Sequence, residues 1–457
     1  MKINDTIAAV STPRGKGGVA LIRVSGEEAL AVCERVFAPK SKKRLSELED
    51  RRAVYGDIVA SDMKIDDGMA VVFRAPHSFT GEDTVEITCH GGLLVTEEVL
   101  SAILAAGARA AEAGEFTRRA FVSGKLTLSE AEGLGALLEA KTHAALLLSR
   151  AGLDGRLSGE IAEIYEALLG VASALYAAID YPEEDLAEIT REEAAEKLLV
   201  WQARVRELAA TYRSGHAVAE GIRTVICGKP NVGKSSLFNA LVGKEAAIVT
   251  DLAGTTRDVL EQTAVLGEVS LRLFDTAGLH ESMDRVEQIG MARAREALLG
   301  AELVLAVFDG SSPFDDRDRA LCELVQEAGG VKLALLNKCD KSAEEPPKLD
   351  GFSAVLSLSV KTGEGMEKLK ETVRDLFFDG ALSLSEDAVV SNARQHAALV
   401  RCDEALDGAL AAFREGLSED ICCSVLEEAM SALGEIDGRA VSEDIVGEIF
   451  SKFCVGK

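Results

Sequence analysis

Residues 228–235, Gly-Lys-Pro-Asn-Val-Gly-Lys-Ser, constrain the fold more than any other segment of the chain. They match the pattern Gly-x-x-x-x-Gly-Lys-Ser/Thr, and they stand between an apolar run, 223–227, and a run with helical spacing, 236–241. A strand, a glycine-rich loop and a helix in this order indicate a phosphate-binding loop, whose backbone N–H groups face phosphate oxygens. We therefore predict an α/β nucleotide-binding domain, with Lys234 at the outer phosphates and Ser235 at Mg²⁺. A chance Gly-rich turn is the alternative.

Two further motifs each follow an apolar run that predicts a buried strand. Asp-Thr-Ala-Gly at 275–278 follows 271–274, and its Asp275 can hold Mg²⁺ through water while its glycine N–H faces the γ-phosphate. Asn-Lys-Cys-Asp at 337–340 follows 332–336. Its Asp340 can accept hydrogen bonds from N1–H and the exocyclic amine, two donors that guanine presents together and adenine does not. The order of the motifs predicts GTP rather than ATP.

Two shorter segments complete the predicted nucleotide site. Ser359-Val360-Lys361 is typical of the loop that backs the base. Gly-Thr-Thr-Arg-Asp at 254–258 lies between the first two motifs and predicts a switch segment in which the Thr256 hydroxyl contacts Mg²⁺. By pattern alone, an ordinary polar loop is the alternative for the second segment.

The group that orients the hydrolytic water is not evident from spacing. Ras-like switches use a glutamine directly after the Asp-x-x-Gly motif, and this chain has Leu279 there, which cannot orient water. Four polar side chains follow closely enough to replace it. They are Glu281, Asp284, Glu287 and Gln288. Each can equally be a solvated loop residue, so spacing alone leaves the choice open.

The pattern of apolar and helix-forming residues along the chain predicts three parts. Residues 1–118 read as mixed α and β, 119–215 and 382–457 as helical, and 216–381 as alternating strands and helices. We therefore predict a multidomain protein, with an α/β nucleotide-binding domain inserted into a discontinuous all-α domain that follows an α+β domain. Thr127 and Glu130 have the spacing of a helix capping box.

Composition excludes several classes. The net charge of −26 argues against a surface that binds nucleic acid or anionic lipid throughout, so such contacts need a local patch or a partner. Nine cysteines without a Cys-x-x-Cys pattern argue against a disulfide framework or zinc ribbon. No secretory signal and no membrane-spanning run is evident, so we expect a soluble protein of the cytoplasm. We interpret Cys422 and Cys423 as helix packing.

Several segments outside the nucleotide motifs make the sequence resemble the MnmE (TrmE) family of tRNA-modification GTPases over essentially its whole length. They are Gly17–Ala20, Arg23–Gly26, Ser78–Asp83, Gly114–Thr117, Ile179–Glu184, Gly254–Asp258 and Phe453–Lys457. Departures from the family pattern are small. Val455 stands where Ile is commoner and Val360 where Ala is usual, and neither change removes a functional group.

The resemblance implies an N-terminal folate-binding and dimerising domain, a discontinuous helical domain, and an inserted Ras-like P-loop GTPase domain. It implies a homodimer whose two GTPase domains pair around K⁺ and thereby switch on hydrolysis. It assigns the catalytic role to Glu287 and K⁺ contacts to Asn231, Thr250, Leu252 and Thr255. Motifs and resemblance together predict these GTP contacts: Asn231, Val232, Gly233, Lys234, Ser235, Ser236, Thr250, Thr255, Thr256, Asp275, Thr276, Ala277, Gly278, Asn337, Lys338, Asp340, Ser359 and Lys361.

The resemblance also implies a site for 5-formyltetrahydrofolate or a related one-carbon tetrahydrofolate. The matching positions are Arg23, Glu86, Lys125 and Lys457, and the family's tail cysteine matches Cys454. Arg and Lys suit the glutamyl carboxylates of folate, and Glu86 suits its amino-pyrimidinone edge. Each residue can equally be a surface charge. Cys454 can equally be a small buried hydrophobe.

The family acts with the FAD-dependent MnmG (GidA). The pair adds an aminomethyl or carboxymethylaminomethyl group at C5 of the wobble uridine of certain tRNAs. The alternative function is a GTP-switched assembly factor for ribosomes or RNA, of the Era or Der type. Such a factor would lack the folate-site residues and the C-terminal Cys-x-Gly-Lys tail, so the sequence favours the tRNA-modifying GTPase.

Overall fold

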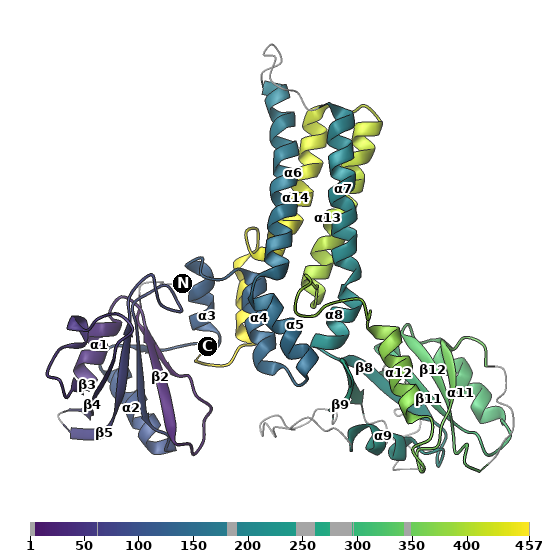
Figure 1. The fold of residues 1–457 in the computed structure, drawn as a ribbon, viewed down its shortest axis with the longest axis horizontal. Helices are drawn as coiled ribbons and strands as arrows, with labels where there is room; N and C mark the ends of the chain where they lie inside the picture. The colour runs from purple at the N-terminus through teal and green to yellow at the C-terminus, as the bar shows by residue number, and fades with distance from the viewer. Residues whose placement is uncertain are drawn as a thin grey trace. The chain divides into compact units, whose positions relative to one another are not determined.

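The structure is a computed structural model that describes residues 5–61, 63–180, 190–243, 261–274, 295, 297–341 and 349–456. Its chain divides into two compact units. The first comprises residues 1–135 and 434–457, and the second comprises residues 136–433 (Figure 1). No helix in the described ranges is both long and apolar enough to cross a membrane.

The first unit contains a seven-stranded sheet in the order β3-β4-β5-β6-β2-β1-β7, antiparallel except for the pair β1/β7. Its strands are β1 (Ile7–Val10), β2 (Val19–Ser25), β3 (Phe37–Pro39), β4 (Ala53–Ala60), β5 (Met63–Phe73), β6 (Thr84–His90) and β7 (Arg109–Ala110). Successive side chains of a strand point to opposite faces of the sheet. Ile22 of β2 is buried under helices α1 (Ala29–Val36) and α2 (Leu93–Ala105), so its neighbour Arg23 points to the other face.

Three helices complete this unit, one of them from the chain's C-terminal segment. They are α3 (Glu115–Val122), the first part of α4 (Leu128–Glu139) and α15 (Glu443–Ser451). A short 3₁₀ turn, η1 (Leu45–Glu47), lies beside α1. The predicted capping box is confirmed, because Thr127 N donates to Glu130 Oε2 over 2.8 Å and Glu130 N donates to Thr127 Oγ1 over 3.2 Å.

The second unit begins with helices. They are α5 (His143–Leu153), α6 (Arg156–Asp180), α7 (Arg191–Ala210), α8 (Tyr212–Ala219), α13 (Ala393–Arg414) and most of α14 (Glu419–Asp437). Helices from the two halves of the sequence lie side by side, and α6, α7, α13 and α14 form a bundle (Figure 1). Cys422 and Cys423 are buried on α14, which confirms their interpretation as packing residues.

The second unit also contains a six-stranded sheet in the order β13-β12-β11-β8-β10-β9, in which only β9 is antiparallel to its neighbour. Its strands are β8 (Ile222–Gly228), β9 (Glu261–Leu266), β10 (Val269–Phe274), β11 (Leu303–Asp309), β12 (Val331–Asn337) and β13 (Ala354–Ser357). The runs 223–227, 271–274 and 332–336, predicted as strands, lie in β8, β10 and β12, which confirms that prediction. α9 (Lys234–Val242) and α12 (Met366–Phe377) cover one face, and α11 (Asp316–Gln326) covers the other.

Candidate functional site

The phosphate-binding loop connects β8 to α9 and is closed by two glycines in left-handed conformations. Gly228 has φ +156°, and a Cβ there would lie 2.4 Å from the carbonyl oxygen of Val307. Gly233 has φ +106°, and a Cβ there would lie 2.2 Å from Nδ2 of Asn337. A side chain fits at neither position, so the loop can curl tightly enough to turn its N–H groups toward an anion.

Lys234, the first residue of α9, curls back over this loop. Its Nζ donates to the carbonyl oxygens of Gly228 over 2.9 Å and Lys229 over 2.7 Å. Burial lowers the pKa of Lys234, and no carboxylate of the described residues pairs with it. By contrast, Lys229 pairs with Asp315 and Asp318. A half-buried ammonium bonded only to carbonyls suits a polyanionic ligand such as a triphosphate.

Asn337 joins the phosphate-binding loop to the loop predicted to back the base. Its Nδ2 donates to Val232 O over 2.7 Å, and its Oδ1 accepts from Val360 N over 3.1 Å. Lys338 is also tied to the phosphate-binding loop, because its Nζ donates to Asn231 O over 2.9 Å. These bonds tie the phosphate-binding loop at the end of β8 to the 337–340 motif, more than a hundred residues later at the end of β12, and tie that motif to the 359–361 loop.

Asp340 is oriented by the same neighbouring loop. Ser359 Oγ donates to Asp340 Oδ1 over 2.7 Å, and Ser359 itself is fully buried. Among the described residues, one hydroxyl on one oxygen orients this carboxylate, which leaves its other oxygen for the edge of a base. Lys361 of the same loop is exposed.

Asp309, at the end of β11, is a site residue that sequence reasoning missed. Its Oδ2 accepts from Lys338 Nζ over 2.6 Å, and its Oδ1 accepts from Ser311 Oγ. Burial alone would raise the pKa of Asp309, but the hydrogen bonds from Lys338 and Ser311 bring it below the ordinary value. The signal that could have found it is its place, since an Asp directly after the apolar run 303–308 ends a strand as Asn337 does.

The remaining predicted nucleotide residues are either exposed on α9 or lie outside the described ranges. Ser235 and Ser236 are exposed on the first turn of α9. The following lie outside the described residues: Thr250, Leu252, Thr255, Thr256, Asp275, Thr276, Ala277, Gly278, Leu279, Glu281, Asp284, Glu287, Gln288 and Lys457.

A second polar site lies on the sheet of the first unit. Arg23 and Glu86 are direct neighbours on β2 and β6, and Arg23 Nε donates to Glu86 Oε1 over 2.9 Å. The Arg23 guanidinium also lies over two rings, 5.1 Å from the centre of Phe79 and 5.6 Å from that of Phe116. Lys125 Nζ donates to Pro76 O over 3.1 Å, at the start of the loop that carries Phe79.

Residues 454–456 contact the first unit just after β1 and just before α3. Gly114 N donates to Cys454 O over 3.4 Å, and Ser11 Oγ donates to Gly456 O over 3.0 Å. Cys454 is exposed, so its reading as a buried hydrophobe is wrong. Of the predicted folate residues, the structure thus brings Arg23 and Glu86 into direct contact.

Comparisons with known proteins cover the whole chain. The family description "GTP-binding protein TrmE N-terminus" matches residues 6–125, and "MnmE helical domain" matches residues 128–454. A protein of Moorella thermoacetica described as tRNA modification GTPase MnmE is 42% identical over 465 aligned residues, covering 100% of both chains. One of Chloroflexus aurantiacus with the same description is 43% identical, also covering 100% of both. With its GTP-type motifs at one sheet edge, the chain belongs to the MnmE family of tRNA modification GTPases.

Proposed function

We propose that the protein hydrolyses GTP and, with an FAD-dependent partner of the MnmG (GidA) type, adds an aminomethyl or carboxymethylaminomethyl group at C5 of the wobble uridine of certain tRNAs. The observation that carries this proposal is that one chain holds a GTP-type site and also an Arg23–Glu86 pair on a sheet domain that binds the chain's own C-terminal tail. The Era or Der type of assembly factor is disfavoured, because the chain matches the TrmE N-terminal family over residues 6–125.

The described residues account for nucleotide binding. The N–H groups of the loop before α9 face the phosphates, and Lys234 exchanges its carbonyl partners for phosphate oxygens. Asp340, held by Ser359, reads the guanine edge. Ser235 and Thr256 would hold Mg²⁺, which neutralises charge on the β- and γ-phosphates when bound.

Hydrolysis is proposed to need a second copy of the chain and K⁺. Asn231 has φ +63° and an exposed side chain, and its backbone oxygen accepts from Lys338, so the residue is anchored while its amide faces solvent in the part of the chain that the structure describes. Its amide oxygen, with groups of Thr250, Leu252 and Thr255, would hold K⁺. That cation supplies the positive charge that an arginine finger supplies in other GTPases. Glu287 is the proposed positioning group for the hydrolytic water.

The first unit is proposed to bind 5-formyltetrahydrofolate or a related one-carbon folate. Arg23 and Glu86 are each about one-fifth exposed, so their charges are reachable yet shielded from bulk water. Arg23, Lys125 and Lys457 suit the ligand's carboxylates, and Glu86 suits its amino-pyrimidinone edge. The exposed Cys454 is a candidate modification site.

The proposed domains are 1–118 for folate binding and dimerisation, 119–215 with 382–457 for the helical part, and 216–381 for the GTPase. The net charge of −26 fits a division of labour in which the partner supplies much of the tRNA-binding surface.

Nucleoside analysis of tRNA tests the proposed function. Cells lacking the protein should lose the C5-modified wobble uridine, and the wild-type gene should restore it. A Lys234→Ala gene should not restore it, since that change removes the phosphate contact. Unchanged tRNA nucleosides in cells without the protein would exclude the modification role and favour the assembly factor.

A further inference from the structure

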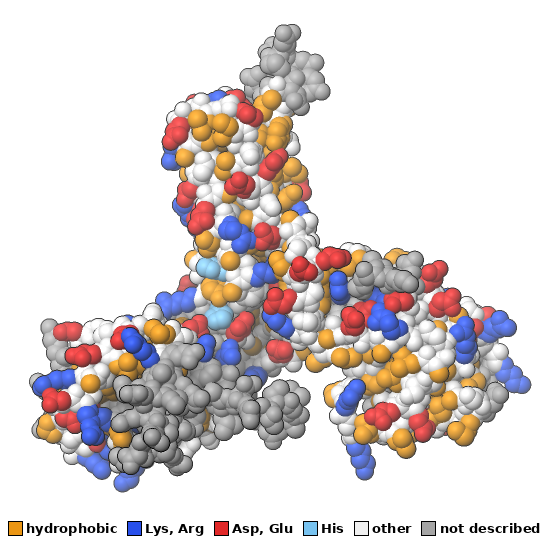
Figure 2. Space-filling model, turned by 180° about the vertical axis from the view of Figure 1, so that it is seen from behind, with side chains coloured by type: hydrophobic (Ala, Val, Ile, Leu, Met, Phe, Trp, Pro, Cys, Tyr) orange, Lys and Arg blue, Asp and Glu red, His pale blue; other side chains and the backbone are white. Residues whose placement is uncertain are grey.

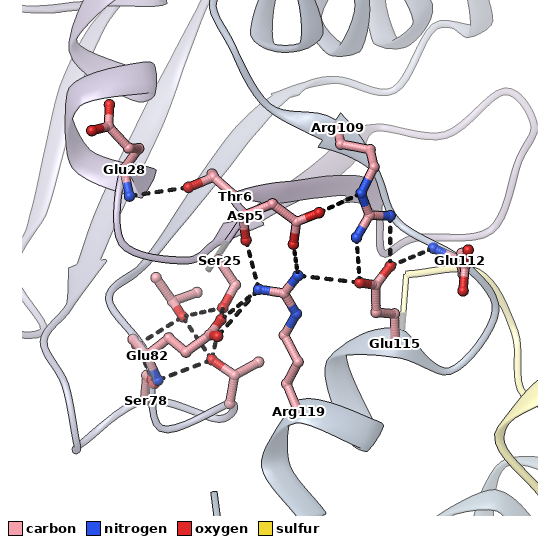
Figure 3. Close-up of polar contacts among 12 residues, drawn as sticks. Asp5, Thr6, Ser25, Glu28, Ser78, Glu82, Arg109, Glu112, Glu115 and Arg119 are labelled. Carbon is pink, nitrogen blue, oxygen red and sulfur yellow. Dashed lines mark hydrogen bonds and ion pairs between the residues drawn. The ribbon is translucent and has the colours of Figure 1, made fainter. Parts of the chain in front are cut away.

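A buried ionic network in the first unit is centred on Arg119 of α3 (Figure 3). Arg119 is 2% exposed, and its Nη1 donates to both carboxylate oxygens of Glu82 over 3.1 Å. Its Nη2 donates to Glu115 Oε1 over 3.1 Å and to Asp5 Oδ1 over 2.7 Å. Arg109 binds the same Glu115 from the other side, over 2.6 Å.

Hydrogen bonds from the arginines favour the charged forms of Glu115 and Asp5. Burial alone would raise the pKa of Glu115, but hydrogen bonds from Arg109, Glu112 N and Arg119 bring it below the ordinary value. Burying so many charges is weak support for stability, because desolvation opposes the Coulomb attraction. A guanidinium with carboxylates on two sides does, however, fix their relative positions through its rigid fork of donors.

Two acids of the network lie in the segments that carry the rings flanking Arg23. Glu82 is three residues after Phe79, and Glu115 directly precedes Phe116. Phe79 belongs to the loop between β5 and β6, and Phe116 belongs to α3. Arg119 therefore links the two segments between which the Arg23 guanidinium lies.

The same acid fixes the turn that receives the C-terminal tail. Glu115 Oε2 accepts from Glu112 N over 2.8 Å, which closes the turn before α3. Gly114 in this turn, with φ +64°, donates its N–H to Cys454 O. A Cβ at Gly114 would lie 2.4 Å from the carbonyl oxygen of Phe450, so the turn and the tail fit closely.

We infer that Arg119 is a positioning residue of the one-carbon folate site. Through Glu82 and Glu115 it holds both aromatic rings against Arg23, and through the Glu112–Glu115 turn it holds the C-terminal tail at Cys454. The inference rests on the proposed folate binding. Arg119 itself is buried and touches no ligand; it acts by keeping Arg23, Glu86 and the tail in one arrangement.

The test compares Arg119→Lys, Glu82→Gln and the control Arg118→Lys in the full-length protein. Lysine keeps the charge at 119 but replaces the fork by one ammonium, which cannot bridge Glu82 and Glu115 together. Glutamine keeps the size of Glu82 and removes its charge. Arg118, the next residue on α3, is only partly buried and none of the bonds of Figure 3 involves it. Binding of 5-formyltetrahydrofolate is measured by calorimetry, below the melting temperature of every variant.

We expect both network variants to weaken folate binding by about tenfold or more, because each change removes a charge-assisted hydrogen bond that holds the site residues in place. Arg118→Lys should bind as wild type does, and all variants should hydrolyse GTP at the wild-type rate. In the complete modification reaction, the KM for the folate should rise while kcat stays within about twofold. A raised KM with an unchanged kcat indicates that Arg119 positions the folate site, whereas a general loss of structure in the first unit would lower kcat as well.

Three outcomes would overturn the inference. Glu82→Gln and Arg119→Lys could bind folate as tightly as wild type, or Arg118→Lys could weaken binding equally. If Arg119→Lys fails to fold, Glu82→Gln alone decides. If the wild-type protein itself does not bind the folate, the proposed folate function fails first and takes the inference with it, an outcome visible without any variant.

Discussion

Asn337 Nδ2 donates a 2.7 Å hydrogen bond to the carbonyl oxygen of Val232, and both residues are buried where the parallel strands β12 and β8, on either side of β11, end. The same side chain accepts from Val360 N. One amide thus satisfies a carbonyl of the phosphate-binding loop and an N–H of the loop behind the base. The shape of the nucleotide site therefore depends on a residue that need not touch the nucleotide.

Asn337→Ala should weaken nucleotide binding. The change leaves the buried carbonyl of Val232 without a partner, at a cost of about 1–3 kcal/mol, and it also removes the acceptor of the half-buried Val360 N–H. We expect a fluorescent GDP analogue to bind roughly tenfold to a hundredfold more weakly. Cys339→Ala, in the same motif, is the control and should bind as wild type does. Equal affinities for Asn337→Ala and the control would show that the loops hold their shape without this amide.

Asp340→Asn should change the base that the protein prefers. An amide presents donors where the carboxylate accepts from guanine N1–H and the exocyclic amine, whereas xanthine offers a carbonyl in place of that amine. We expect GDP affinity to fall by about tenfold or more and xanthosine diphosphate to bind better than GDP. Competition between the two nucleotides measures the preference. Ser359→Ala should lower GDP affinity without changing the preferred base, and a retained guanine preference in Asp340→Asn would contradict the role of Asp340.

The nucleotide site was largely predictable because its residues lie in short motifs next to apolar runs. The strands β8, β10, β11 and β12 follow from continuous burial on both faces, which leaves a hydrophobic run in the sequence. β9 and β13 were not predicted, since these edge strands carry mixed polar residues.

The network of Figure 3 could not be predicted from spacing. Arg119 meets Glu82 across 37 positions and Asp5 across 114, and each looks like a surface charge in the sequence. The contact of the tail with Ser11 spans 445 positions. Pairings at such distances follow from tertiary packing, which local patterns do not record.

His216 of α8 should make stability depend on pH. Its Nε2 lies 3.1 Å from Glu302 Oε1, and this hydrogen bond raises the pKa of His216 above 6.5. Burial alone would raise the pKa of Glu302, but His216 and Arg223 N bring it below 4.5. The pair therefore stabilises fully between pH 4.5 and 6.5. Its contribution is lost as pH rises through the raised pKa of His216, and also as pH falls through the lowered pKa of Glu302.

Thermal melting of His216→Gln against wild type measures this dependence. The difference in melting temperature should be largest near pH 6 and should shrink above neutrality. His396→Gln is the matched control, because burial lowers the pKa of His396 and the sign reverses: protonation of that ring opposes folding in acid. A difference for His216→Gln that does not change between pH 5.5 and 8.5 would contradict the ion pair.

Glu287→Ala should separate GTP binding from hydrolysis. Alanine cannot orient water, whereas the loop, Lys234 and Asp340 that bind the nucleotide are untouched. We expect unchanged affinity for a non-hydrolysable GTP analogue and a loss of turnover of about a hundredfold or more. Glu281→Ala, in the same segment, is the control and should keep its rate. Wild-type turnover in Glu287→Ala would exclude Glu287 as the residue that orients the hydrolytic water and would leave Asp284 and Gln288 as candidates.

GTP turnover should depend on which alkali cation is present. An amide oxygen from Asn231 and oxygens of the 250–255 segment would form a cage that suits K⁺, whereas Na⁺ is too small to reach all of its ligands at once. Because the cation offsets charge that develops between the β- and γ-phosphates, its loss slows chemistry more than binding. Rates measured in KCl and NaCl at equal ionic strength should differ by about tenfold or more. Asn231→Ala should lose the difference and keep the slow rate in both salts. Equal wild-type rates in the two salts would exclude a cation-dependent mechanism.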